Sequence, residues 1–237
     1  MNEMFVKAIK TGIFEEGEDL LAFIIRYVKS IQDQSIIVVT SKIVALSENR
    51  TAIVPNKKAK EKLILGESQF ALPTKHVWLT VKDGLLMANA GIDESNANGK
   101  LILLPKDSFK AARLLRKKLL VKYKVKELGV LITDSRTSPL RAGVTGVALG
   151  YAGFRGVKDY RGKRDIFGRI AKYSRTNVAD CLATAAVLVM GEGNEQQPLA
   201  VIKKSGIEFC DTVNRKELEI AIKDDMYRPL FSKLRKK

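Results

Sequence analysis

The stretch DSFKAARLLRKKLLVKYKVKELGVLITDS, residues 107–135, contains a predicted helix followed closely by a predicted strand. An acid and a serine at its start can cap the helix, leucines recur at helical spacing, and Gly129 is the expected stop. The apolar run 130–133 then predicts a short strand that ends at Asp134. A helix that leads into a buried strand indicates an α/β fold, and a carboxylate at the end of such a strand is a common place for catalytic chemistry.

Outward from this unit, helices and strands follow one another in an irregular order. The β-branched run 35–39 predicts a buried strand, and residues 177–190, apolar on nearly every face, predict a buried helix. This order is not that of a regular doubly wound sheet, so we predict a mixed α/β (α+β) fold. No linker or repeat divides residues 1–237. We also expect a short N-terminal strand, a helix over 18–31, a hairpin of strands 77–81 and 85–90, strands at 100–105 and 199–203, an irregular glycine-rich stretch from 134 to 175, and a C-terminal helix.

The composition narrows the classes of protein that fit. The longest apolar stretch is too short to span a bilayer, and the N-terminus lacks the apolar core of a signal peptide, so we expect a cytoplasmic protein without membrane partners. Lysine and arginine number 42 against 26 acids, a net charge of +16 that attracts nucleic acid, phosphorylated cofactors or acidic metabolites. Aromatic residues are sparse among the basic clusters, so stacking platforms for bases are not evident. A basic nucleic-acid-binding protein therefore stays a lesser alternative.

The histidine and cysteine content limits the kind of metal site. The chain has a single histidine, His76, and two cysteines, Cys181 and Cys210, each alone in its context. This spacing argues against a zinc site or a redox motif. Any metal site must therefore be built from oxygen ligands, which points to Mg²⁺ or Mn²⁺.

Three polar clusters, at residues 91–96, 134–141 and 191–195, interrupt the apolar structure. In the first, one of two adjacent carboxylates can face a metal, although turn-forming residues of this kind also make plain solvated loops. In the second, an acid lies beside a hydroxyl and two arginines. The glycines that follow can line a ligand or simply pack two strands tightly. The third places glycine-flanked acids after a buried helix, where they can serve a metal or nucleotide or merely stop the helix.

Together the clusters favour phosphoryl-transfer chemistry. They supply separated carboxylates, arginines and glycine-rich loops, with no nucleophilic triad and no imidazole base. Positioning and charge neutralisation perform most of the catalysis in phosphoryl transfer. We therefore predict a nucleotide-dependent enzyme in which Asp134 is catalytic and Arg136 and Arg141 clamp a phosphate or carboxylate.

Five ordered motifs resemble the CofE-type γ-glutamyl ligases. The resemblance implies a single catalytic domain over residues 1–237, with two closely joined lobes, that works as an intertwined homodimer. It implies an enzyme that uses GTP or ATP and two divalent ions, Mg²⁺ or Mn²⁺, to phosphorylate a substrate carboxylate, from which the amine of L-glutamate then displaces phosphate. The motifs are GIFEEGEDL (12–20), TSKIVALSENR (40–50), ANAGIDESN (88–96), LITDS (131–135) with PLRAGVTGVALGYAG (139–153), and RGKRDIFGR (161–169) with ADCLATAAVLVMGEGNEQQP (179–198).

The resemblance also implies roles for individual residues, by their match to the family's motifs. The third cluster corresponds to a nucleotide- and metal-binding loop, residues 191–197, in which one of two acids touches the metal. The implied metal ligands are Asp93, Asp134, Ser135 and either Glu192 or Glu195. The implied nucleotide-binding positions are Gly12, Ile13 and Phe14 through their backbone, and Ser41, Lys42, Asn96, Gly191, Gly193, Asn194 and Gln196.

Two departures from the family pattern concern the substrate. Leu46 stands where the coenzyme F420 branch usually has a second lysine, and the stretch 137–141 reads TSPLR where that branch tends to read Gly-Arg-Pro-Trp-Arg. Sequences with these features resemble the branch proposed to lengthen the glutamate tail of folate. We therefore predict a folate γ-glutamyl ligase, with coenzyme F420-0 as the alternative acceptor. The missing lysine also leaves open an enzymatically silent family member.

Overall fold

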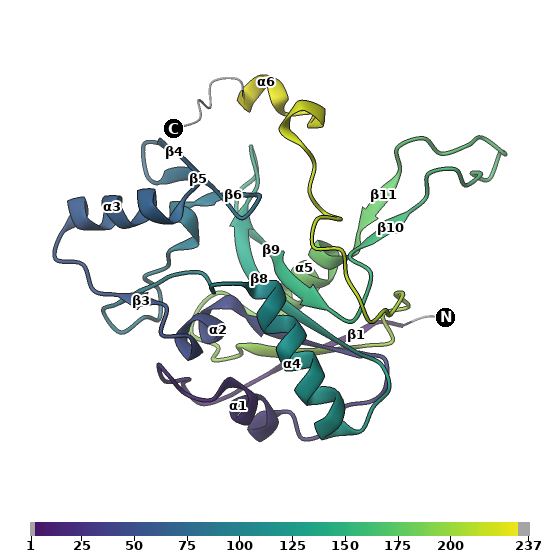
Figure 1. Ribbon diagram of the computed structural model, residues 1–237, viewed down its shortest axis with the longest axis horizontal. Coiled ribbons are helices and arrows are strands. Elements are labelled where there is room, and N and C mark those ends of the chain that lie inside the picture. The colour runs from purple at the N-terminus through teal and green to yellow at the C-terminus, as the bar shows by residue number, and fades with distance from the viewer. Residues whose placement is uncertain (1–2, 232–237) are drawn as a thin grey trace.

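A five-stranded mixed sheet forms the centre of the computed structural model, which describes residues 3–231 (Figure 1). In order across the sheet, the strands are β1 (Phe5–Ile9), β12 (Leu199–Lys203), β2 (Ser35–Thr40), β8 (Leu128–Thr137) and β9 (Val144–Ala152). Strands β2 and β8 run parallel, and the other neighbours run antiparallel. The carboxyl ends of β2 and β8 therefore meet at one edge of the sheet.

Alternate side chains of the strands point into two separate hydrophobic layers. In β2, Ile37 and Val39 face one layer, Ile36 and Val38 face the other, and all four are fully buried. This period of two is what a strand covered on both faces requires. The covering helices are α1 (Leu20–Tyr27), α2 (Ser41–Ser47) and α4 (Ser108–Tyr123) on the first face and α5 (Val178–Met190) on the second (Figure 1).

A smaller lobe beside the main sheet has a hydrophobic cluster of its own. Ile64, Ile92, Leu101 and Leu103 are its buried members. Glu67, at the end of the lobe's helix, forms ion pairs with Arg50 and Lys82. These ion pairs join three segments of the lobe. Its elements are β3 (Thr51–Ala52), α3 (Lys57–Glu67), β4 (Phe70–Pro73), β5 (Trp78–Lys82), β6 (Leu85–Ala88), the 3₁₀ turn η1 (Asn89–Gly91) and β7 (Leu101–Ile102). The predicted division into two joined lobes is compatible with this arrangement.

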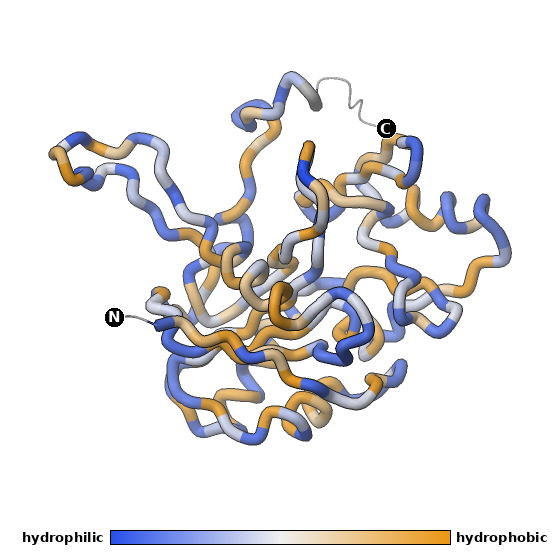
Figure 2. Tube along the Cα trace, turned by 180° about the vertical axis from the view of Figure 1, so that it is seen from behind, coloured by the Kyte–Doolittle hydropathy of each residue, from blue (hydrophilic) through white to orange (hydrophobic). Residues whose placement is uncertain are grey.

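A long hairpin arm leaves the body of the protein after β9. Its base is formed by β10 (Val157–Asp159) and β11 (Arg175–Asn177), and its tip extends well away from the sheet (Figure 1). Figure 2 shows an apolar stretch at the tip between hydrophilic flanks. Ile166 and Phe167 there are 91% and 89% exposed. An apolar tip of this kind is a typical contact surface for another molecule.

The segment after β12 crosses the molecule as an extended strap with little regular structure. Glu217 of the strap accepts hydrogen bonds from the buried Tyr151 hydroxyl at 2.6 Å and from the Gly156 backbone N–H at 2.7 Å. Arg215 makes a two-pronged contact with Asp107, the cap of α4. The strap ends in η2 (Ile222–Asp224) and α6 (Arg228–Phe231). No helix in the described part of the chain is long and apolar enough to cross a membrane.

The predicted mixed α/β fold is confirmed, and most predicted elements occur within a few residues of their expected places. The helix expected over 18–31 is the shorter α1, and the strand expected at 100–105 is the two-residue β7. Helices α2 and α3 were not predicted, because α2 has only seven residues and the first half of α3 is a lysine-rich run with little apolar pattern. Of the predicted C-terminal helix, the structure describes α6, and residues 232–237 lie outside the described range.

The expected irregular stretch from 134 to 175 is wrong in its first part, where β8 and β9 form a long antiparallel pair. Glycines hid this pair, since Gly146 and Gly150 weaken the strand pattern. A Cβ on Gly146 would lie 2.3 Å from the Ala183 carbonyl oxygen, and one on Gly150 would lie 2.4 Å from the Ser108 carbonyl carbon. The glycines therefore let α5 and α4 approach the sheet, which is the tight-packing alternative.

Gly129 does not stop the long helix as expected. The helix ends at Tyr123, and Lys124 takes the left-handed conformation with φ of 55°. Gly129 instead lies inside β8, where a Cβ would come within 2.9 Å of Ile36 and Phe154 side chains. The helix-to-strand transition is correctly predicted, and its position is shifted by five residues.

Candidate active site

One edge of the central sheet gathers several of the predicted site segments. Because β2 and β8 run parallel, Ser41, directly after β2, lies beside Asp134 in the last part of β8. Because β12 runs antiparallel to β2, the loop 191–197 that precedes β12 arrives at the same edge. Strand β1 also ends there, which places residues 12–14 nearby. The strand topology thus brings together segments that are far apart in the sequence.

Asp134 is the partly buried centre of this edge. Its Oδ1 accepts the Ser135 backbone N–H at 2.8 Å, and its carboxylate also accepts the Ser41 hydroxyl. Burial raises the pKa of Asp134 to about 6 despite these hydrogen bonds, and the nearby carboxylates of Asp93 and Glu192 add to the rise. Asp134 is therefore a desolvated carboxyl group with two further carboxylates nearby.

Asp93 lies on the loop 91–99, which a two-way backbone pairing with Ile102 fixes to β7. Its Oδ1 accepts the Ser95 backbone N–H at 2.7 Å, and its Oδ2 accepts the Ser95 hydroxyl at 2.9 Å and the Lys42 ammonium at 2.8 Å. Burial favours the neutral acid, but Lys42 and Ser95 together hold the pKa of Asp93 below its usual value. Asp93 is therefore an ionised carboxylate with a resident cation.

The loop 191–197 contributes one of its two acids to this cluster. The Ser135 hydroxyl donates to Glu192 Oε2 at 3.1 Å, next to Asp134. Glu195 turns back onto its own loop, where its Oε2 accepts the Gly193 N–H at 2.8 Å and its carboxyl group lies against Gly191. Of the two candidate metal ligands, the structure thus brings Glu192, and not Glu195, to the other carboxylates.

Further hydrogen bonds join this loop to the other predicted nucleotide segments. Asn96 donates its side-chain N–H to the Gly193 carbonyl at 2.9 Å, and the Thr11 N–H donates to the Gln196 carbonyl at 2.9 Å. Gln196 itself has a positive φ of 55°. Asn194 lies exposed on the same loop.

The N-terminal segment 12–14 is only partly available to a ligand. The Gly12 N–H donates to the Tyr27 hydroxyl at 2.9 Å, so this donor is already used. Phe14 packs its ring in the core against Phe23, with centroids 4.9 Å apart, while Ile13 is 73% exposed. Any contact from Phe14 to a ligand must therefore come from its backbone, as the resemblance implies.

Within residues 3–231, neither predicted catalytic arginine forms an ion pair with Asp93, Asp134 or Glu192. Arg136 Nη2 lies 3.2 Å from Asp180 Oδ2 on the first turn of α5. Arg141 lies in the exposed turn between β8 and β9, and within residues 3–231 no hydrogen bond or ion pair joins it to Asp134. The clamp role of Arg136 and Arg141 stays a prediction, and in this structure the Arg136 guanidinium pairs with Asp180.

Asp180 is the residue of this region that the sequence reasoning missed. It accepts the Ala148 N–H of β9 at 2.9 Å and the Asn177 side-chain N–H at 2.9 Å, in addition to Arg136. It therefore joins α5 to both strands of the β8–β9 pair. The signal for it was present, since Asp180 is an acid in the first turn of an otherwise apolar helix.

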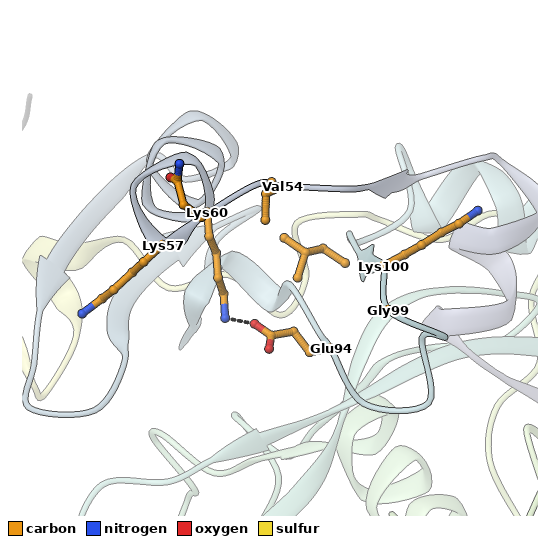
Figure 3. Close-up of a pocket in the computed structure, with 8 residues that line it drawn as sticks. Val54, Lys57, Lys60, Glu94, Gly99 and Lys100 are labelled. Atoms are coloured by element: carbon orange, nitrogen blue, oxygen red, sulfur yellow. Dashed lines mark hydrogen bonds and ion pairs between the residues drawn. The ribbon is translucent and has the colours of Figure 1, made fainter.

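A cavity of about 330 Å³ opens beside the loop that carries Asp93 (Figure 3). Lys60 points across it to Glu94, with which it forms an ion pair. The cavity is lined by Val54, Asn56, Lys57, Lys60, Glu94, Gly99, Lys100 and Leu101. Lys60 pairs with Glu94 and Lys100 with Glu16, so within residues 3–231 Lys57 is the lining lysine without an ion pair to receive an acidic ligand.

The predicted metal ligands fit a hard cation in chemistry but are not arranged as a closed cage. Asp93, Asp134, Ser135 and Glu192 offer only oxygen donors, which suits Mg²⁺ or Mn²⁺. The nearby carboxylates of Asp93 and Glu192 beside Asp134 also fit a divalent cation. Among the described residues, however, no group of three His, Cys, Asp or Glu side chains is already set to hold a metal ion.

Comparison with known proteins decides the family. The family model for "F420-0:Gamma-glutamyl ligase" matches residues 8–204 of this chain. The chain belongs to this family of γ-glutamyl ligases. The match covers the main sheet except for the first part of β1, together with the smaller lobe, the arm and all three polar clusters.

Curated relatives in this family align with nearly the whole chain. The "Coenzyme F420:L-glutamate ligase" of Methanococcus maripaludis strain C7 is 33% identical over 246 residues, covering 95% of this chain and 98% of the relative. The protein of the same name from Methanocaldococcus jannaschii is 32% identical over 243 residues, with 94% and 96% covered. The one from Archaeoglobus fulgidus is 31% identical over 234 residues, with 91% and 92% covered.

These relatives confirm the predicted family and the predicted enzyme class. They also bear on which of the two acceptors is favoured. The relatives described here are coenzyme F420 ligases by name, and none is a folate ligase. The choice of folate rested on Leu46 and on residues 137–141. The comparisons favour the alternative, coenzyme F420-0, over folate.

Proposed function

We propose that this chain is a nucleoside-triphosphate- and metal-dependent ligase that joins L-glutamate to coenzyme F420-0 as an amide. The family match and the names of the relatives support the glutamate and the acceptor. The observation that carries the chemistry is the meeting of Asp93, Asp134 and Glu192 at one edge of the sheet. These carboxylates come from three loops or strands between 41 and 99 residues apart. Because like charges repel, their convergence is expected where a bound cation neutralises them.

Asp93, Asp134, Ser135 and Glu192 are the residues that would hold divalent ions. Such ions, when bound, neutralise the charge of a transferring phosphoryl group. The nucleotide would lie against Lys42, Asn96 and the backbone of the loop 191–197, since these segments are joined around the same carboxylates. GTP and ATP both fit this proposal.

The reaction joins two steps. A carboxylate oxygen of the acceptor attacks the γ-phosphorus, so a P–O bond forms and the nucleoside diphosphate leaves. The amine of glutamate then attacks the acyl carbon, phosphate leaves with the C–O electron pair, and the amine loses a proton to give the amide. The Lys42 ammonium, which pairs with Asp93 in this structure, would have to exchange partners to favour the anionic phosphate, while Lys57 in the cavity next to Asp93 can accept an acidic end of the acceptor.

We further propose that the protein acts in the cytoplasm as a homodimer. The exposed apolar tip of the arm, with Ile166 and Phe167, supports a second copy as its partner. Light scattering on wild type and on Phe167→Asp tests this, because a charge at the tip should shift a dimer to monomers. A wild-type mass of one chain would contradict it.

The proposed function is tested by incubating purified protein with glutamate, a divalent ion, and either GTP or ATP. Coenzyme F420-0 and tetrahydrofolate monoglutamate are supplied in separate reactions, and products are identified by mass. We expect one glutamate mass to be added to F420-0 together with phosphate release. Addition of glutamate to the folate alone would show that folate, and not F420-0, is the acceptor. If no product forms with either compound, a ligase acting on these acceptors is refuted.

A further inference from the structure

The Lys42 ammonium is fully used within the protein. Its Nζ lies 2.8 Å from Asp93 Oδ2, 2.7 Å from the Ser95 carbonyl oxygen and 3.1 Å from the Ser95 hydroxyl. An ammonium has three N–H donors and no more, so these contacts leave none for a phosphate. A lysine in this state neutralises Asp93 and does not bind a nucleotide.

Both carboxylate oxygens of Asp93 also have partners within the protein. Its Oδ1 accepts the Ser95 N–H at 2.7 Å, and its Oδ2 accepts both the Ser95 hydroxyl and Lys42. Lys42 sits at the start of α2 with its side chain 26% exposed, and the Asp93 side chain is 44% exposed, so the pair is open to exchange with solvent species. A cation that approaches Asp93 Oδ2 meets a site already occupied by a protein cation.

We propose that Lys42 is the internal counter-ion of Asp93 and that a divalent ion competes with it for this carboxylate, so that metal binding releases the Lys42 ammonium to an anionic ligand. The inference rests on the proposed function, in which Asp93 is a metal ligand. It gives Lys42 two successive partners, first Asp93 and then a phosphate. Metal and nucleotide binding are then positively coupled through one side chain.

The exchange explains why the carboxylates converge without forming a closed metal cage. Asp134 and Glu192 receive no ion pair within residues 3–231, whereas Asp93 is turned toward Lys42 and Ser95. Without Lys42, Asp93 would carry an unbalanced charge beside the other two acids. The lysine therefore holds the metal-free site together, at a cost in metal affinity.

The test is Mn²⁺ binding to the full chain without nucleotide, followed by electron paramagnetic resonance of the free ion. Lys42→Met should bind Mn²⁺ at least about tenfold more tightly than wild type, because the competing cation is gone. Lys42→Arg keeps a competing charge and should stay within about threefold of wild type. Lys60→Met is the matched control. Lys60 pairs with Glu94, the residue after Asp93, so its loss removes one positive charge near the site without freeing Asp93.

The exchange is overturned if Lys42→Met binds Mn²⁺ no more tightly than wild type. It is also overturned if Lys60→Met gains as much Mn²⁺ affinity as Lys42→Met. The lysine would then serve phosphate alone or act only through the overall charge. Circular dichroism of each variant confirms that it is folded. If wild type forms the glutamate product while Lys42→Met shows no gain, the exchange fails and the ligase function stands. If wild type neither binds Mn²⁺ nor forms product, both fail.

Discussion

Glu67 offers a sharp test of how the smaller lobe is held together. Its Oε2 accepts Arg50 Nη2 at 2.7 Å and Lys82 Nζ at 2.8 Å, and the three side chains are between 12% and 21% exposed. Arg50 also donates to the Leu104 carbonyl at 3.1 Å, just after β7. The network therefore connects α3 and β5 to the strand that fixes the loop of Asp93. Glu67→Gln keeps the size of the side chain and removes its charge.

The expected loss follows from the burial of this network. Removing one partner of a fully buried ion pair costs about 3–5 kcal/mol, and water at these partly exposed groups lowers that figure. Glutamine also retains one acceptor oxygen, so we expect a loss of about 2 kcal/mol at pH 7, or about 4–8 °C in Tm for a chain of this size. Burial alone would raise the pKa of Glu67, but Lys82 and Arg50 hold it below its usual value of 4.5.

The pH dependence has a definite sign. Because the folded-state pKa lies below the unfolded one, the stabilisation from Glu67 is complete above about pH 4.5 and is lost as the pH falls through the lower, folded value. Urea unfolding of wild type and Glu67→Gln at pH 7 and in acid measures this. Glu18→Gln is the control, since its partner Arg26 is 57% exposed and its loss should cost below about 0.5 kcal/mol. A Glu67→Gln loss no larger than the control, or a difference that persists in acid, would refute the reasoning.

Two further substitutions test the packing around the β8–β9 pair. Gly146→Ala places a Cβ against the Ala183 backbone of α5, so urea unfolding should show a loss of about 1–3 kcal/mol, and an unchanged stability would contradict the close approach. Asp180→Asn removes the ion pair to Arg136 while keeping an oxygen for the backbone of β9, so we expect a loss of about 1.5–3 kcal/mol. A double variant with Arg136→Met measures the coupling, and strictly additive losses would show that the ion pair contributes nothing.

The sequence predicted the elements whose patterns are strong. The β-branched run that forms β2 and the apolar helix α5 were placed closely, because burial on both faces or all round leaves a continuous apolar signal. Strand β9 was missed because its glycines serve the helices that pack on it, so local strand preference and tertiary packing disagree.

The family resemblance predicted which residues come together at the site, and the individual contacts between them were not predicted. That Asp93 and Asp134 approach each other follows from the parallel pairing of β2 with β8 and from the bridge between Asp93 and Ile102. Neither pairing has a local sequence signal, since partners in a sheet are chosen by the whole fold. The same holds for the ion pairs of Lys42 and Arg136, which only the assembled chain reveals.

The central claim, that the carboxylates gathered at this edge drive a metal-dependent ligation, is tested most directly at Asp134. Wild type and Asp134→Asn are compared for glutamate addition to coenzyme F420-0 with GTP and Mn²⁺, by mass, with circular dichroism to confirm an intact fold. We expect the variant to lose at least about a hundredfold in turnover, because asparagine keeps the shape and removes the charge. Turnover within about tenfold of wild type in a folded variant would contradict the account.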